Sequence, residues 1–151
     1  MNLARTLAAI AVSGLAFQAE AYTENCKTTD EREIASLFDG WNAALATGNP
    51  TEVAARYADD SILLPTLSNT PRLTQATRRD YFVQFLQSKP RGTIDTRLIQ
   101  IGCNSAVDAG TYTFTFADGK QVAARYTYTY RWDGTRWLIS SHHSSAMPEL
   151  K

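Results

Sequence analysis

Residues 93–145 read TIDTRLIQIGCNSAVDAGTYTFTFADGKQVAARYTYTYRWDGTRWLISSHHSS, and this stretch decides the fold. Aromatic, β-branched and polar side chains alternate along it with a period of two, which is typical of strands. The dipeptides Asp118-Gly119 and Asp133-Gly134 are hairpin-turn signals. The pattern therefore predicts an antiparallel meander of four strands, over residues 93–103, 106–116, 121–132 and 136–145.

The preceding part of the chain shows helical spacing instead. Apolar residues from Ile34 to Leu45 form one stripe after a cap at Thr29 or Asp30. A short second helix, capped by Thr51, is expected to turn Tyr57 inward, and a turn at 59–60 follows it. After the turn we expect a brief strand over 61–65 and an irregular segment over 67–72. A third helix is expected to begin after a cap at Thr74.

Helices followed by a meander indicate an α+β fold, in which N-terminal helices pack on a curved antiparallel sheet. The length of 151 residues fits one domain. A curled sheet closed by helices encloses a cone, and a ligand site is expected in that concave space. Lys plus Arg and Asp plus Glu number 15 each, so no net charge favours nucleic acid as a partner.

The N-terminus has the features of a secretory signal peptide. Arg5 gives a positive start, residues 7–17 are uncharged and mostly apolar, and Ala19-Glu20-Ala21 fits the cleavage rule. We expect a signal peptide over 1–21, a flexible segment over 22–29 and the domain over 30–149. The alternative, a membrane anchor, is disfavoured because the apolar run is short. The expected location is periplasmic or secreted, with no membrane association after cleavage.

Cys26 and Cys103 are candidates for a disulfide, since exported proteins oxidise paired cysteines. The alternative is two free thiols. No metal site is expected, because the chain has only two cysteines and two histidines and lacks ligand spacing.

Several stretches together carry a family resemblance. They are residues 41–50 (WNAALATGNP), 57–69 (YADDSILLPTLSN), 80–86 (DYFVQFL), 124–128 (ARYTY), 133–134 (DG), 137–139 (WLI) and 142–145 (HHSS). With them the chain resembles the bacterial branch of the calcium/calmodulin-dependent protein kinase II association-domain family, within the nuclear-transport-factor-2-like and SnoaL-like superfamily. The resemblance implies a cone-shaped α+β fold, self-association through the outer sheet face and a deep pocket that holds arginines. Kinase activity is not implied, because the chain has no kinase domain.

Three arginines are the candidate ligand-binding residues. Arg125 lies mid-strand with small neighbours on its face, Arg97 lies in a similar strand, and Arg72 follows the irregular segment near the expected mouth of the cone. A guanidinium binds a carboxylate through paired hydrogen bonds, so a small carboxylate is the expected ligand. The alternative is that these arginines pair with acids on the sheet, as Arg97 with Asp95.

Adjacent strand residues face opposite sides, so only one of His142 and His143 enters the pocket. Parity with Trp137 and Ile139 favours His143 as a binding residue and acid–base candidate. The alternative is a histidine with a purely structural hydrogen bond.

Trp41, Tyr57 and Asp60 correspond to pocket-facing positions of superfamily enzymes, and Asp60 is the second catalytic candidate. The alternative for Asp60 is a turn residue. The stripe Tyr126, Tyr128 and Tyr130 is a candidate dimer face.

The favoured hypothesis is a non-catalytic, exported binding domain that forms a homodimer or larger homo-oligomer and holds a small anionic molecule. The alternative is a cofactor-free SnoaL-like isomerase, cyclase or hydrolase, and a third is a structural oligomer with a vestigial pocket. No cofactor is expected, because no glycine-rich phosphate loop or metal-ligand cluster occurs in the sequence.

Overall fold

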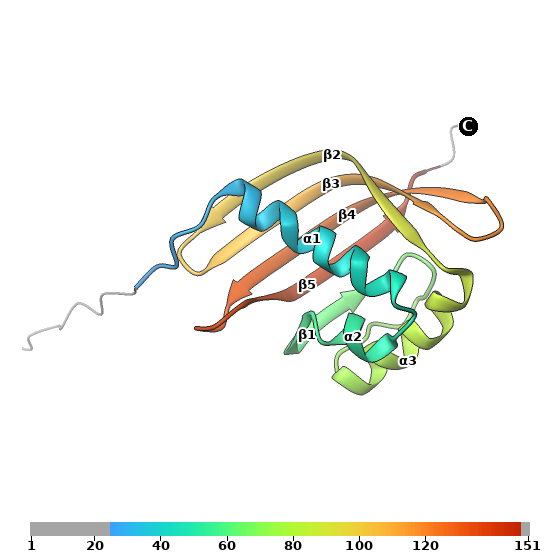
Figure 1. Ribbon diagram of the computed structural model, residues 1–151, viewed down its shortest axis with the longest axis horizontal. Coiled ribbons are helices and arrows are strands. Elements are labelled where there is room, and N and C mark those ends of the chain that lie inside the picture. The colour runs from blue at the N-terminus through green and yellow to red at the C-terminus, as the bar shows by residue number, and fades with distance from the viewer. Residues whose placement is uncertain (1–24, 149–151) are drawn as a thin grey trace, which may run out of the picture.

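The structure, a computed structural model, describes residues 25–148. The predicted signal peptide over 1–21 lies outside these residues. A curved sheet wraps around a long helix, and the shorter helices gather at one end (Figure 1). Within residues 25–148, no helix is both long and apolar enough to cross a bilayer.

Residues 25–148 contain three α-helices and one 3₁₀ turn. α1 spans Glu31–Ala46, α2 Pro50–Ala54 and α3 Gln75–Phe85, and η1 spans Leu86–Ser88. Asp30 and Thr74 cap α1 and α3 as predicted, each accepting a backbone N–H. The predicted cap of α2 was wrong, because the Asn49 side chain accepts from the Thr51 N–H at 3.0 Å.

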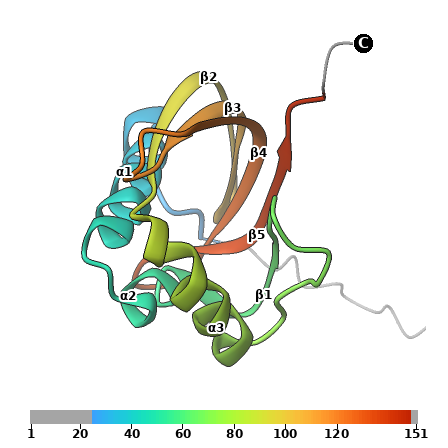
Figure 2. The same ribbon diagram turned by 90° about the vertical axis from the view of Figure 1, so that its right-hand side faces the viewer.

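Five strands form one sheet in the order β1-β5-β4-β3-β2. They are β1 Tyr57–Leu64, β2 Arg91–Gly102, β3 Ser105–Thr115, β4 Gln121–Trp132 and β5 Trp137–Ala146. β2 to β5 form the predicted meander, whereas β1 joins β5 in parallel. Viewed from the end, the sheet is an arc that α1 closes (Figure 2). The α+β prediction is therefore confirmed.

β1 is longer than the sequence suggested. It begins at Tyr57, so Tyr57 is a strand residue rather than part of a helix, and the predicted turn at Asp59 and Asp60 is wrong. Pairing with β5, far along the chain, holds the strand on both sides of these acids, at Tyr57 and at residues 62–64. On its other edge, the Arg78 guanidinium donates to the carbonyl oxygens of Ser61 at 2.7 Å and Ala58 at 2.9 Å, which satisfies edge groups that would otherwise be free.

The concave face of the sheet forms the core with α1. Tyr126, Tyr128 and Tyr130 lie on this face and are at most 3% exposed. The predicted tyrosine dimer face is therefore wrong, because Tyr126 and Tyr128 pack inward against Phe38 and Trp41 of α1, and Tyr130 stacks on Tyr128. Burying aromatic rings is worth more than exposing them on a sheet surface.

A bulge in β5 decides which histidine points inward. Thr129 pairs with Ser141, but the next residue, Tyr130, pairs with Ile139, so Ser140 is extra. The extra residue reverses the alternation after Ile139. His142 is consequently buried at 4% exposure and His143 lies exposed on the outer face.

The predicted disulfide between Cys26 and Cys103 is present. It fastens the segment before α1 to the β2–β3 turn, where the Lys27 N–H also donates to Asn104 at 2.8 Å. The Lys27 ammonium lies 4.9 Å from the ring centre of Trp132. The part of the predicted flexible segment that the structure describes is therefore attached to the sheet.

Candidate ligand-binding cavity

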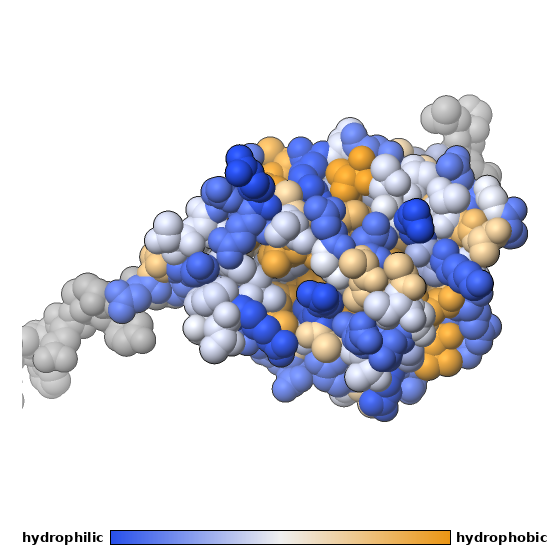
Figure 3. Space-filling view, in the orientation of Figure 1, coloured by the Kyte–Doolittle hydropathy of each residue, from blue (hydrophilic) through white to orange (hydrophobic). Residues whose placement is uncertain are grey.

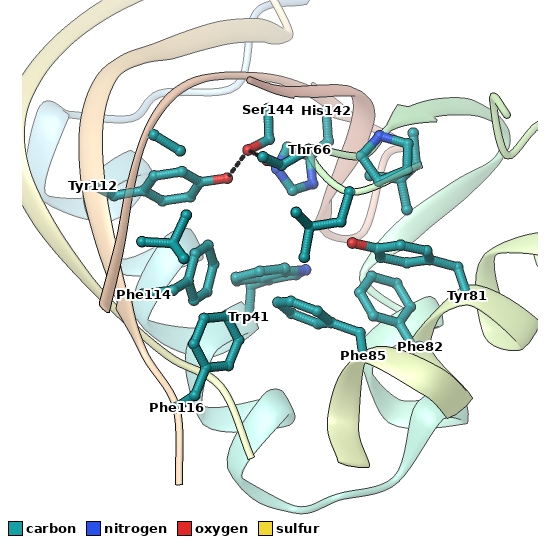
Figure 4. A pocket seen from close by; sticks show the side chains of 15 residues that line it. Trp41, Thr66, Tyr81, Phe82, Phe85, Tyr112, Phe114, Phe116, His142 and Ser144 are labelled. Carbon is teal, nitrogen blue, oxygen red and sulfur yellow. Dashed lines mark hydrogen bonds between the residues drawn. The ribbon is translucent and has the colours of Figure 1, made fainter. Parts of the chain in front are cut away.

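A small cavity lies at the end of the cone where α3 meets the sheet (Figure 4). Its free volume is about 30 Å³, which suffices for one or two waters or a carbonyl-sized group. Aromatic rings from α1, α3, β3 and the β3–β4 hairpin make seven of its fifteen lining residues. The lining residues are Trp41, Leu63, Pro65, Thr66, Leu67, Tyr81, Phe82, Phe85, Tyr112, Phe114, Phe116, Val122, Ala124, His142 and Ser144.

His142 is the first polar group of this wall. Its Nδ1 lies 2.8 Å from the Tyr57 hydroxyl, which accepts a hydrogen bond from Trp41 Nε1 at 3.1 Å. The imidazole stacks on Tyr128 with ring centres 4.1 Å apart. Burial, and secondarily the neighbouring His143, lowers the pKa of His142 to about 3. His142 is therefore a neutral imidazole at physiological pH.

Ser144 is the second polar group. Its Oγ accepts a hydrogen bond from the Tyr112 hydroxyl at 2.5 Å and contacts the Thr66 hydroxyl (Figure 4). Burial raises the pKa of Tyr112 above its usual range, so this hydroxyl stays protonated. The polar part of the cavity wall therefore consists of neutral groups.

A wider groove of about 570 Å³ adjoins the cavity. The two share Leu67, Tyr81, Phe85, Phe116 and Val122 as lining residues. Hydrophobic surface lies beside α3 on the face shown in Figure 3, and Leu67 is 68% exposed. The part of the groove wall that is shared with the cavity is therefore largely apolar, whereas Arg72, Asp80, Asp118 and Lys120 place charges on the rest of the groove.

Arg72 is the predicted arginine that comes nearest to this site. It lines the groove with Lys120, and its guanidinium carbon lies 5.8 Å from the ring centre of Tyr81. Its Nη2 donates to Ser68 at 3.1 Å. Arg72 therefore lines the groove beside the cavity and not the cavity wall.

Arg125 does not line the cavity. It is exposed on the outer face of β4, where its Nη2 lies 3.5 Å from the carbonyl oxygen of Ala146. From the sequence, we expected the face of β4 on which Arg125 has small neighbours to line the cavity. The structure has the opposite arrangement, because Ala124 and Tyr126 take the concave side.

Arg97 points into the cone, but away from the cavity. Its Nε lies 3.1 Å from Oδ1 of the fully buried Asp108, which also accepts from the Tyr126 hydroxyl at 2.8 Å. A bulge in β2 at Asp95 brings Arg97 to the concave side. Asp95 instead accepts from Thr113 at 2.9 Å, so the predicted pair of Arg97 with Asp95 is absent.

The two predicted acid–base residues lie outside the cavity. His143 is exposed on the outer face, because the β5 bulge turns His142 inward instead. Asp60 pairs with Arg131, which donates to it at 2.8 Å, and this hydrogen bond lowers the pKa of the carboxyl. Of the other predictions, Trp41 lines the cavity and Tyr57 lies behind His142.

Sequence reasoning missed His142, Ser144, Thr66 and Tyr112 as site residues. The HHSS motif did indicate this part of β5 as a site. Which of its residues face inward depends on the β5 bulge, and no local residue pattern predicts that bulge. Within residues 25–148, no cluster of three or more side chains could hold a metal ion. The site therefore consists of neutral donors and acceptors in an aromatic wall.

The comparisons with known structures agree with this architecture. A protein from Xanthomonas campestris, described as a calcium/calmodulin dependent protein kinase II association domain, is 48% identical over 87% of this chain and 100% of its own, with a TM-score of 0.77. A nuclear-transport-factor-2-like protein of Pseudomonas putida is 17% identical over 84% and 93%, with a TM-score of 0.71. A Streptomyces avermitilis protein described as a candidate dehydratase shares 9% identity over 78% and 97%, with a TM-score of 0.68.

The last two similarities, at low identity, show the nuclear-transport-factor-2-like fold alone. A comparison with curated proteins found no match. The family model for the calcium/calmodulin dependent protein kinase II association domain matches residues 30–148, which is nearly the whole domain. The chain belongs to this association-domain family.

Proposed function

We propose that this chain is an exported, self-associating domain that binds a small molecule in the aromatic cavity. The observation that carries the proposal is the cavity itself, a largely apolar space whose few polar groups include the His142 imidazole and the Ser144 hydroxyl. Ligand sites have this composition, in which apolar walls provide affinity and a few fixed polar groups provide orientation. The adjoining groove supplies the room that the cavity alone lacks.

Export is supported by the disulfide. Cys26 and Cys103 form a bond that persists in oxidising compartments such as the periplasm or the extracellular space. The signal-peptide features of residues 1–21 agree with this location.

Self-association is supported by the family and by the outer face of the sheet. Small or β-branched residues dominate the middle of that face, with Ala109 opposite Thr127 at its centre and Leu98 64% exposed nearby. Charged residues are depleted in the cores of protein interfaces. Ala109 and Thr127 carry no charge, whereas Arg125 and His143 lie on the same face beside Thr127 and would border the interface core. We propose a homodimer or larger homo-oligomer that forms through this face.

The enzymatic alternative is less well supported by the geometry. Neither His143 nor Asp60 reaches the cavity, and the histidine that does reach it has a pKa of about 3. A base with so low a pKa accepts protons poorly near neutral pH. Binding without turnover is therefore the function that the described residues support best.

A native mass spectrum of the mature protein, purified without added ligand, tests the proposal. We expect a homo-oligomer that retains a small molecule. Replacing Ala124, a cavity residue that is 1% exposed, by Leu fills the space, so Ala124→Leu should lose the bound molecule. Ala46→Leu, at the exposed end of α1, is the matched control. A monomer, or retention of the molecule by Ala124→Leu, contradicts the proposal.

A further inference from the structure

The hydrogen bonds behind the cavity fix where His142 carries its proton. Trp41 Nε1 can only donate, so the Tyr57 hydroxyl accepts from it. Tyr57 has one proton to donate, and the only other partner of this hydroxyl within residues 25–148 is Nδ1 of His142. The hydroxyl proton of Tyr57 therefore makes a hydrogen bond only if Nδ1 of His142 accepts it. The neutral imidazole then carries its own proton on Nε2.

Nε2 of His142 is buried and has no hydrogen-bond partner within the part of the chain that the structure describes. An unsatisfied buried donor destabilises a protein, because the group loses its hydrogen bonds to water without gaining others. Native structures therefore pair such groups with protein, water or ligand. Since His142 lines the cavity, the missing partner is expected to be a molecule that enters there.

We propose that the Nε2–H of His142 donates a hydrogen bond to an uncharged oxygen acceptor, such as a carbonyl or ether oxygen, of a small aromatic ligand. This inference rests on the proposed binding function and names the class of ligand. The free volume of about 30 Å³ admits the acceptor group but not a ring. The ring would lie in the adjoining groove, against Tyr81, Phe85 and Phe116.

The charge of the cavity favours an uncharged acceptor over the carboxylate expected from the sequence. Among the described lining residues, none carries a cation, and His142 is neutral. A carboxylate placed there would lose its hydration without gaining a counter-ion, which is strongly unfavourable. Arg72 in the groove could pair with an acid, but it does not line the cavity wall beside His142.

The tautomer can be measured directly, because the chain has only two histidines. In a nitrogen-15 histidine spectrum of the disulfide-bonded protein, His142 should show a protonated Nε2 and an unprotonated Nδ1. His143, on the outer face, is the internal reference. Tyr57→Phe keeps the ring but removes the donor to Nδ1, so it should shift the His142 tautomer signals and leave those of His143. A protonated Nδ1, or a cationic His142 at neutral pH, overturns the inference.

The ligand class is tested in the same spectrum with three probes of similar size: acetophenone, cumene and benzoate. Acetophenone should shift the Nε2 signal of His142 and bind about fivefold to tenfold more tightly than cumene, which lacks the acceptor. His143→Gln should not change this ratio, whereas His142→Phe should abolish it.

The possible failures have different meanings. Equal binding of acetophenone and cumene, or tighter binding of benzoate than of acetophenone, overturns the inference and leaves the proposed binding function standing. If Arg72→Gln then weakens benzoate, the groove arginine is the anion site. If none of the three probes binds, both the inference and the proposed cavity site are contradicted.

Discussion

The Nε of Arg97 lies 3.1 Å from Oδ1 of Asp108, and Asp108 is completely buried. Arg97 itself is 24% exposed at its side chain. The pair joins β2 to β3, and the Tyr126 hydroxyl extends it to β4. This relationship makes the pair a cross-strand link in the sheet interior, and it gives the first prediction.

Asp108→Ala should strongly destabilise the protein. Removing one partner leaves the Arg97 guanidinium partly buried without a counter-charge, and such losses amount to about 3–5 kcal/mol. Tyr126→Phe removes one hydrogen bond only and should reduce the free energy of unfolding by about 1 kcal/mol. Urea unfolding of both variants measures the difference. Equal effects would show that the ion pair adds nothing beyond the tyrosine hydrogen bond.

Stability should fall in acid because of His142. Its pKa is about 3 in the folded protein, whereas an unfolded histidine has a pKa of about 6.5. Below the unfolded value the unfolded chain binds a proton that the folded protein does not, so acid favours unfolding. Between about pH 7 and about pH 5 this contributes a loss of about 2 kcal/mol.

Denaturant unfolding at these two pH values, at fixed protein concentration, checks the pH effect. His142→Phe should lose this component of the pH dependence, while His143→Gln should keep it. A pH dependence that is the same in wild type and His142→Phe would show that another group is responsible.

Reduction of the disulfide should weaken the fold. The bond between Cys26 and Cys103 closes a long loop, with a sequence separation of 77. The chain-entropy model gives about 4 kcal/mol for such a loop, as an upper figure. The double variant Cys26→Ser/Cys103→Ser should unfold at lower urea concentration than the oxidised wild type and should not respond to reductant. Coincident unfolding curves for oxidised and reduced wild type would contradict this prediction.

Disruption of the outer sheet face should separate the oligomer. Ala109→Arg places a charge at the centre of that face, opposite Thr127, where a partner subunit would exclude water. Sedimentation should then show a monomer with an unchanged circular-dichroism spectrum. Ser36→Arg, on the exposed side of α1, is the control and should remain oligomeric. Dissociation by Ser36→Arg but not by Ala109→Arg would place the interface elsewhere.

The alternation over residues 93–145 predicted the meander and the α+β class correctly. A period-two pattern indicates a strand whatever its pairing register with the neighbouring strands. The disulfide was also predictable from two cysteines in a chain with export features. The strand through Asp59 and Asp60 was not predictable, since it is held by parallel pairing with β5 on both sides of these acids, at Tyr57 and at residues 62–64, rather than by local preference.

Site residues were harder to predict, because the faces of strands were assigned by simple alternation. One extra residue in β5 turns His142 inward in place of His143. In β4 the opposite face from the predicted one is concave, so Tyr126 points inward in place of Arg125. Both orientations depend on long-range packing against α1, which a single sequence does not reveal. The resemblance predicted the fold and the family, but it did not predict which side chains line the cavity.

A crystal structure of the mature, disulfide-bonded protein grown without added ligand is the most direct test of the cavity as a binding site. The account predicts continuous non-protein density that runs from the groove over Phe116 into the cavity and ends within hydrogen-bonding distance of His142 Nε2. A cavity that holds only water, with Leu67 and Phe116 closed over it and His142 Nε2 bonded to a protein group, would contradict it.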